Sequence, residues 1–183
     1  MHIIAGRLRR RRLHAPKGLK TRPTSGRVRE AMFNILESRR SLDGAAVLDL
    51  FAGIGSLGLE ALSRGAASAV FVEDRPAVLQ VARRNAEECG VSSACRFQCM
   101  DALRYLERYH GPPWDLVFAD PPYGLESAAD LPAGIAPILA PDGLFVFEHD
   151  HRWRYEACPG LVLRRVYGRT TISVFEHVRE APE

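Results

Sequence analysis

The sequence lacks any apolar run near the length that a membrane span requires, and its cysteines are few. The first arginine stands at position 7, before any secretory apolar segment could form. No C-x-x-C pair occurs, so we interpret the cysteines as small core residues of a reducing compartment rather than as metal ligands. They are Cys89, Cys95, Cys99 and Cys158. These absences predict a cytoplasmic protein with neither a membrane nor a metal partner.

Lysine is also scarce: 23 of the 25 basic residues are arginine. The basic residues are unevenly distributed along the chain. Residues 1–40 hold twelve basic and two acidic residues, whereas the other 143 residues hold 13 basic and 20 acidic ones. A basic segment on an acidic body favours nucleic acid as a partner of that segment. The residues expected to bind RNA are Arg9, Arg10, Arg11, Arg12, Lys17, Lys20 and Arg22.

Two other interpretations of the basic segment stay open. A solvated charged face explains many short basic runs, and a mitochondrial transit peptide is also rich in arginine and poor in acids. Pro16, Pro23, Gly6 and Gly18 would interrupt the amphipathic helix of such a peptide. We therefore expect residues 1–24 to form a basic N-terminal hairpin or arm, followed by one catalytic domain over residues 25–183.

The composition, with 46% hydrophobic and 26% charged residues, is that of one globular domain. A helix is predicted from Thr24 or Ser25 to about Arg40, and β-rich and helical segments alternate after it. This alternation predicts a parallel sheet covered by helices on both faces, closed by an antiparallel hairpin. The predicted strands cover 46–50, 69–73, 95–98, 116–119, 144–148, 161–167 and 171–176, and the helices between them cover 56–64, 75–88, 102–108 and 131–139.

A glycine-rich turn follows the first predicted strand. Gly53, Gly55 and Gly58 satisfy G-x-G-x-x-G, and Glu73 stands twenty residues after Gly53. Asp49, just before the turn, would repel a pyrophosphate but suits a cationic ligand such as S-adenosylmethionine (SAM). Glu73 can accept hydrogen bonds from ribose hydroxyls, and Asp101 can accept one from an adenine amine. Each acid can also be a helix cap or a turn former.

A second motif, Asp120-Pro121-Pro122-Tyr123, directly follows a predicted strand. Proline restricts its own φ and the residue before it, so the motif is rigid before any substrate arrives. The Asp120 carboxylate and the Pro121 carbonyl can accept the two N–H groups of an exocyclic amine, and Tyr123 can stack on a planar base. Holding both N–H groups directs the nitrogen lone pair at a methyl group. The alternative is a structural proline turn.

Together these residues resemble the class I SAM-dependent methyltransferases that carry a D/N-P-P-Y/F motif. The motifs RVREAMFN at 27–34, LGLEALSRGA at 57–66 and Glu148-His149 resemble the RsmD family, which methylates guanine N2 in bacterial small-subunit ribosomal RNA. The resemblance implies an α/β, Rossmann-like fold with a seven-stranded, mainly parallel sheet, a C-terminal antiparallel hairpin and a small N-terminal hairpin extension. It also implies catalysis at Asp120, Pro121, Pro122 and Tyr123, and SAM contacts at Asp49, Phe51, Gly53, Gly55, Glu73 and Asp101.

The sequence departs from the pattern of this family at Gly26, Ile54 and Met100, and Met100 puts Asp101 in doubt as a cofactor contact. His149 and His151 flank Asp150 and are more typical of a polar loop than of a metal site. The expected activity is methylation of an exocyclic amine in ribosomal RNA, within a small ribosomal subunit or an assembly intermediate. The alternatives are a DNA adenine-N6 methyltransferase and a non-catalytic ribosome-assembly factor.

Overall fold

The computed structural model describes residues 1–16, 26–122, 124–168 and 170–178. Within them, seven strands form one sheet in the order β3-β2-β1-β4-β5-β7-β6, in which β7 pairs antiparallel with β5 and β6. The strands are β1 (Ala46–Leu50), β2 (Ser68–Val72), β3 (Cys95–Gln98), β4 (Trp114–Ala119), β5 (Leu139–Asp150), β6 (Leu161–Tyr167) and β7 (Thr170–Glu176). The helices are α1 (Gly26–Arg39), α2 (Ser56–Ser63), α3 (Pro76–Cys89), α4 (Ala102–Glu107) and α5 (Leu131–Ile135). The predicted parallel sheet and its closing hairpin are confirmed.

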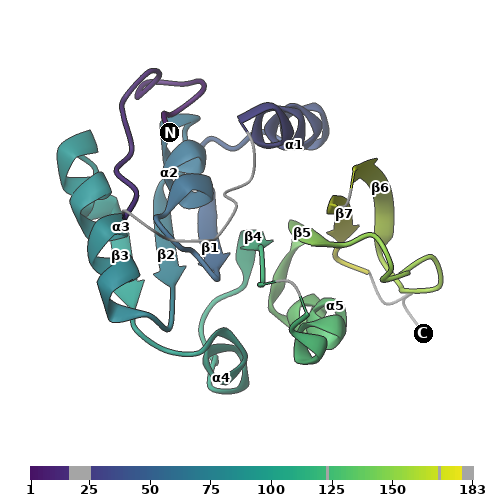
Figure 1. Cartoon of the computed structure of the whole chain (residues 1–183). Coiled ribbons are helices and arrows are strands. Elements are labelled where there is room, and N and C mark those ends of the chain that lie inside the picture. The colour runs from purple at the N-terminus through teal and green to yellow at the C-terminus, as the bar shows by residue number, and fades with distance from the viewer. Residues whose placement is uncertain (17–25, 123, 169, 179–183) are drawn as a thin grey trace.

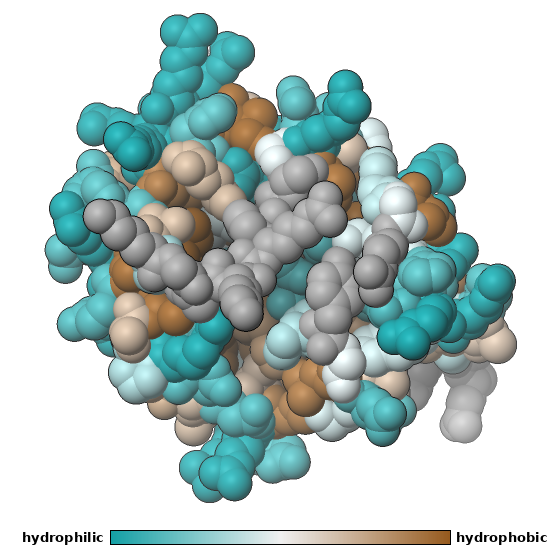
Figure 2. Space-filling model, viewed as in Figure 1, coloured by the Kyte–Doolittle hydropathy of each residue, from teal (hydrophilic) through white to brown (hydrophobic). Residues whose placement is uncertain are grey.

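The helices cover both faces of the sheet, as the alternating sequence pattern requires. One core cluster joins α1, α2 and α3 to the sheet, and a second joins α4 and α5 to its other face. Figure 1 shows α4 and α5 at the bottom of the view and the other helices at its top and left. In the same view, hydrophilic residues dominate the outline of the molecule (Figure 2).

The segment before β5 differs from the prediction. The helix expected over 131–139 ends at Ile135 and continues only as a 3-10 turn over Ala136–Ile138, which contains Pro137. The strand then starts at Leu139, which pairs with Trp114, and an irregularity in the pairing precedes Leu116. Two further 3-10 helices, Ser92–Ala94 and Glu126–Asp130, were not predicted.

Residues 2–12 form a hairpin, closed by an antiparallel bridge between His2 and Arg12. The buried carboxylate of Glu60, in the middle of α2, accepts the backbone N–H groups of Ile4 at 2.8 Å and Ala5 at 3.0 Å. Arg64 donates to the same carboxylate at 2.9 Å. The hairpin is therefore anchored to α2 through its backbone, whatever its exposed side chains contact.

The tip of this hairpin lies at the amino end of the sheet, where the parallel strands begin. Arg7 donates its backbone N–H to the carbonyl of Ser63, the last residue of α2. That end of α2 lies beside the start of β1, because Ala67 donates its backbone N–H to the carbonyl of Ala45. A Cβ at Gly6 would stand 1.9 Å from the Ser63 carbonyl oxygen, so this contact requires glycine. In Figure 1 the hairpin is at the upper left.

The cysteines differ partly from the expectation. Cys89 is buried, but Cys99 is exposed, so the interpretation of all four as core residues is wrong. Within the described residues, all four are free thiols. No helix in the described part of the chain is long and apolar enough to cross a membrane.

Candidate active site

The predicted cofactor and catalytic residues that the structure describes lie at the carboxyl end of the sheet, where the parallel strands finish. Leu50, the last residue of β1, pairs with Val72 on one side and with Ala119 on the other. Phe51, Glu73 and Asp120 are the next residues of these three neighbouring strands. Ligands of open α/β sheets bind at this end, so the register alone brings the two motifs together.

The glycine turn holds three residues with left-handed backbones. They are Phe51 at φ 57°, Gly53 at φ 55° and Gly55 at φ 81°. An aromatic residue rarely adopts such a φ, and such outliers gather at functional sites. A Cβ placed at Gly53 would meet no atom closer than 4.0 Å, so the space over this part of the turn is open. That opening lets a ligand approach the backbone.

The third glycine of the motif has a packing role. A Cβ at Gly58 would stand 2.4 Å from the ring of Phe71 on β2, so only glycine lets α2 approach the sheet this closely. The Gly58 backbone N–H donates to Asp49 Oδ2 at 2.9 Å. The start of α2 is thus held to β1 and packed against β2.

Asp49 lies beneath the turn, and only 1% of it is exposed. Burial raises the pKa of Asp49 to about 8; the hydrogen bond from Gly58 opposes this shift, and the negative charge of Glu73 adds to it. The carboxyl group is therefore largely neutral at pH 7 without a bound ligand. A cation bound over the turn would favour its ionised form.

Glu73 is also buried, at 4% exposure, but has a different environment. Its Oε2 accepts the Gly53 N–H at 2.9 Å, and its Oε1 accepts the Arg75 backbone N–H at 3.2 Å and Nε at 2.7 Å. Arg75 also donates from an Nη to Oε2 at 3.4 Å. Burial raises the pKa of Glu73, but the hydrogen bonds and charge of Arg75 outweigh it, so the pKa lies below its usual value. Glu73 is thus a charged acceptor beside the glycine turn.

These features fit SAM. The turn offers open space at Gly53, and a charged carboxylate follows the next strand, where ribose hydroxyls would need an acceptor. Asp101 caps α4, because its Oδ1 accepts the Arg104 N–H at 2.9 Å, which is the alternative role named for it. The contacts of SAM with these residues stay predictions.

The Asp120 motif lies on the neighbouring strand β4. Asp120 is half-buried and Pro121 is buried. The Pro122 carbonyl accepts the Leu125 N–H at 3.2 Å. Because Ala119 pairs with Phe147, Asp120 lies beside the end of β5. Tyr123 falls outside the described residues, and the catalytic roles of all four motif residues stay predictions.

The residues predicted to bind RNA lie elsewhere. Arg9, Arg10, Arg11 and Arg12 are exposed on the hairpin, whose tip packs against the end of α2 that points away from Asp120. The tip of the hairpin is therefore remote from the catalytic end of the sheet, whereas His14, two residues after Arg12, bonds to Asn85, which donates to Ile54 of the glycine turn. Lys17, Lys20 and Arg22 fall outside the described residues.

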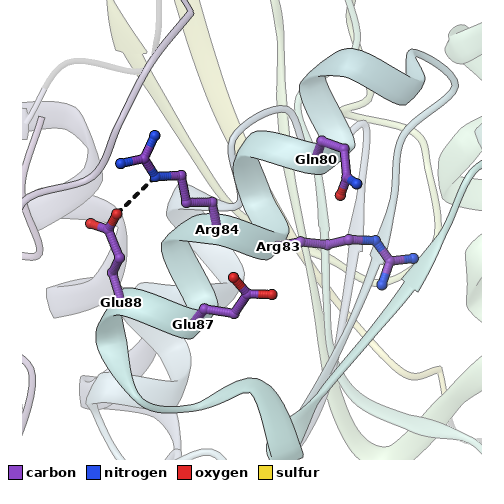
Figure 3. Close-up of a pocket in the computed structure, with 5 residues that line it drawn as sticks. All are labelled: Gln80, Arg83, Arg84, Glu87 and Glu88. Carbon is purple, nitrogen blue, oxygen red and sulfur yellow. Dashed lines mark hydrogen bonds and ion pairs between the residues drawn. The ribbon is translucent and has the colours of Figure 1, made fainter.

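One surface depression contains none of the predicted site residues. This depression, on the outer side of α3 and drawn in Figure 3, is lined by Gln80, Arg83, Arg84, Glu87 and Glu88. Within the described residues, no group of three His, Cys, Asp or Glu side chains could hold a metal ion.

His149 belongs to β5 and is buried, and its Nε2 forms a hydrogen bond with Ser173 Oγ at 2.8 Å. The interpretation of His149 as part of a polar loop is therefore wrong.

Sequence reasoning missed the polar residues that join the hairpin to the site. The buried Asn85 of α3 accepts the His14 N–H at 2.8 Å, and its Nδ2 donates to the carbonyls of His14 and of Ile54 in the glycine turn. Glu60 was missed too. Its signal is a charged residue inside the apolar stretch of α2, and Asn85 lies in the same way among the buried residues of α3.

The sheet order, the glycine turn after β1 and the acidic residues at the carboxyl end define a Rossmann-like fold of the class I methyltransferases. The family model described as Conserved hypothetical protein 95 matches residues 1–176. The chain therefore belongs to this family, and its resemblance to the RsmD family is confirmed.

Named relatives cover different shares of the chain. YlbH of Bacillus subtilis (strain 168) is 34% identical over an alignment of 185 positions, which covers 96% of this chain and 98% of YlbH. Ribosomal RNA small subunit methyltransferase D of Escherichia coli (strain K12) is 42% identical over 123 residues, which are 67% of this chain and 60% of that protein. The solved structure of yhhF from Escherichia coli matches with a TM-score of 0.85 and 32% identity, over 98% of this chain and 99% of that one.

Proposed function

We propose that this chain transfers a methyl group from SAM to the exocyclic N2 amine of a guanine in bacterial small-subunit ribosomal RNA. The observation that carries the proposal is the placement of Asp120 at the end of β4, beside the glycine turn of β1 and Glu73 of β2. The name of the Escherichia coli relative, ribosomal RNA small subunit methyltransferase D, supports the substrate. The substrate is RNA within a small ribosomal subunit or an assembly intermediate, in the cytoplasm.

Each part of the carboxyl end has its own task in this proposal. SAM, when bound, supplies an electrophilic methyl group. The glycine turn and Glu73 hold the cofactor, with Phe51, Gly53 and Gly55 forming its backbone cradle. Asp49 supports the turn from beneath through Gly58, and its charge responds to the cationic ligand. Asp101, at the start of α4, contributes to cofactor binding in this proposal.

Asp120 and Pro121 orient the substrate amine. The amine lone pair is delocalised into the base, so accepting both N–H groups favours the geometry in which the lone pair points at the methyl carbon. Asp120 also stabilises the positive charge that develops on nitrogen as the methyl arrives, and then receives a proton from it. The buried Pro121 fixes the carbonyl beside the carboxylate. Tyr123 stacks on the flipped base.

A DNA adenine-N6 methyltransferase is the second candidate, because the Asp-Pro-Pro-Tyr motif suits that amine equally well. To separate the two, the protein is incubated with methyl-labelled SAM and either naked small-subunit ribosomal RNA, small ribosomal subunits or duplex DNA. The products are then digested to nucleosides. Labelled N2-methylguanosine supports the proposal, labelled N6-methyladenine in DNA supports the second candidate, and SAM binding without transfer supports an assembly factor.

A further inference from the structure

Within the described residues, the tip of the hairpin provides no protein surface near the base that is methylated. The tip lies at the amino end of the sheet, whereas Asp120 lies at the carboxyl end. RNA that reaches Asp120 needs positive charge and stacking surfaces near that residue. The segments that border Asp120 are therefore the places where such a surface must lie.

The β5–β6 loop, residues 151–160, is one of these segments. Tyr155 donates its hydroxyl to the Ala129 carbonyl at 3.1 Å, which joins the loop to the 3-10 helix that follows the Asp120 motif. The loop starts at the end of β5, the strand that pairs with β4. In Figure 1 it lies at the right, across the molecule from the hairpin.

The charge of this region differs from that of its surroundings. Residues 41–149 hold seven basic and 15 acidic residues, so this stretch is strongly acidic. Residues 150–165 hold four arginines and two acids, Asp150 and Glu156. The summed charge of residues 41–183 does not reveal this second basic region, because the negative charge of residues 41–149 is larger. The first arginines of this region follow β5, the strand that pairs with the end of β4 just before Asp120.

The arginines of the loop are exposed and partly ordered. The side chains of Arg152 and Arg154 are 72% and 74% exposed. Asp150 accepts Nε of Arg152 at 2.9 Å and one Nη at 3.0 Å, which orients the guanidinium at the start of the loop. Arg154 lies 3.6 Å from Glu156, a pair that solvent screens.

An aromatic side chain stands between these two arginines. Trp153 is partly exposed, and its ring stacks on His149 with the centroids 6.2 Å apart and an interplanar angle of 14°. The Phe147 ring lies 6.0 Å from Trp153. Trp153 is thus held on one side by buried rings of β5, as a stacking platform must be.

We propose that the β5–β6 loop binds the single-stranded RNA beside the methylated base, with phosphates at Arg152 and Arg154 and a base stacked on Trp153. The inference rests on the proposed function, because it requires RNA as the substrate. Alternating cationic and aromatic residues are the recognition chemistry of unpaired RNA, in which bases are free to stack. Enzymes that modify a base act on single-stranded substrate or extrude the target nucleotide, and the unpaired case gives the loop free bases to stack on.

The first experiment measures RNA binding by a loop variant. Arg152→Gln/Arg154→Gln keeps a donor for Asp150 but removes two charges. We expect the plot of log affinity against log salt for small-subunit ribosomal RNA to flatten by about 1.4, which is 0.7 for each phosphate that is no longer neutralised. Arg108→Gln, an exposed arginine at the end of α4, is the matched control and should keep the wild-type slope.

The second experiment tests the stacking platform. Trp153→Leu should weaken RNA binding by about 5- to 150-fold, as expected when one base stack is removed, whereas Trp153→Phe should retain most of the affinity. The unfolding midpoint and the affinity for S-adenosylhomocysteine are measured in parallel. Unchanged values of both show that a weakened variant is still folded.

The outcomes separate the inference from the proposed function. If the double arginine variant matches Arg108→Gln in slope, or if folded Trp153→Leu binds RNA like the wild type, the loop does not hold RNA and this inference is wrong. If the wild type fails to bind ribosomal RNA, both fail. If the loop variants weaken the binding of a duplex DNA but not of RNA, the assignment of RNA as the partner of the loop is wrong.

Discussion

Glu73 and Glu60 are both buried carboxylates that accept backbone N–H groups, yet they serve opposite ends of the sheet. Glu60 is closed off by the hairpin backbone and by Arg64. Glu73 holds the glycine turn, and its second partner, Arg75, has a half-exposed side chain that can move away. The same side-chain chemistry therefore anchors a structure at one end and prepares a ligand site at the other.

The largest expected effect concerns the anchoring carboxylate. Glu60→Gln removes the charge between Arg29 and Arg64 and should lower the free energy of unfolding by about 3–5 kcal/mol. Glu37→Gln is the control, since Glu37 is an exposed partner of Arg64 and its replacement should cost at most about 1 kcal/mol. Urea unfolding measures both. Equal decreases in stability would remove the special role of Glu60.

The next effect concerns catalysis at the other end. Asp120→Asn keeps an acceptor oxygen but loses the charge, so kcat should fall by about 10²-fold or more. The affinities for SAM and RNA should stay nearly unchanged, because the charge matters most in the transition state. Single-turnover methylation measures the rate. A near wild-type rate would mean that transfer does not need the carboxylate, and would return the glutamine side chain, a substrate of the Asn-Pro-Pro-Tyr branch, as a candidate.

Binding of S-adenosylhomocysteine tests whether Glu73 is a ligand site. Glu73→Ala should weaken binding by about 1–3 kcal/mol. Arg75→Met should instead strengthen it, because Arg75 occupies acceptor positions that ribose hydroxyls would use. Calorimetry on both variants measures whether each change weakens or strengthens the binding of S-adenosylhomocysteine. Weaker binding by Arg75→Met would show that Arg75 supports the bound cofactor rather than competing with it.

The pH dependence of stability should separate Asp49 from Glu73. The folded-state pKa of Asp49 is raised from 3.8 to about 8, so its contribution to stability is present at low pH and is lost as the pH rises through this range. Glu73, with a lowered pKa, contributes stability that is lost as the pH falls. Asp49→Asn should therefore gain stability relative to the ligand-free wild type, by up to about 1.4 kcal/mol for each pH unit. Urea titrations at pH 5, 6 and 7 measure this, and a constant difference would contradict it.

The smallest effect concerns the hairpin. Replacing Arg9, Arg10, Arg11 and Arg12 by Gln should flatten the salt dependence of RNA binding by about 0.7 for each phosphate that these arginines neutralise. The affinity for S-adenosylhomocysteine should not change, because these arginines are exposed residues of the hairpin and not part of the glycine turn. A wild-type salt slope would show that the hairpin does not bind RNA.

The local elements could be predicted from sequence because their signals are local. The strands before Phe51, Glu73 and Asp120 read as short apolar runs, and their parallel order follows from the helices between them. The start of β5 at Leu139 could not be predicted, since the pairing with Trp114 decides it. A helical apolar pattern and a buried strand look alike over so short a stretch.

The environment of each carboxylate was harder to predict. Ile4, a backbone partner of Glu60, lies 56 residues away along the chain. Nothing in an isoleucine or a glutamate at these positions indicates that the two residues pair. The hydrogen bond from the Gly58 N–H to Asp49 was not predicted, and the expected contact of Asp49 with SAM stays a prediction. Which way a side chain points at a strand end depends on the packing of the following helix, and the motif alone does not contain that information.

The anchoring of the first residues also has a consequence for the order of folding during synthesis. Ile3, Leu8 and Leu13 are buried in a core whose other members include residues of α1, α2, α3 and the sheet, so they have nothing to pack on when they leave the ribosome. The hydrogen-bond partners of Ile4, Leu8 and His14 are Glu60, Ser63 and Asn85, which are made 55 to 71 residues later. The N-terminal end of the chain, translated first, must therefore stay unplaced until α3 is complete, and it is among the last segments to settle.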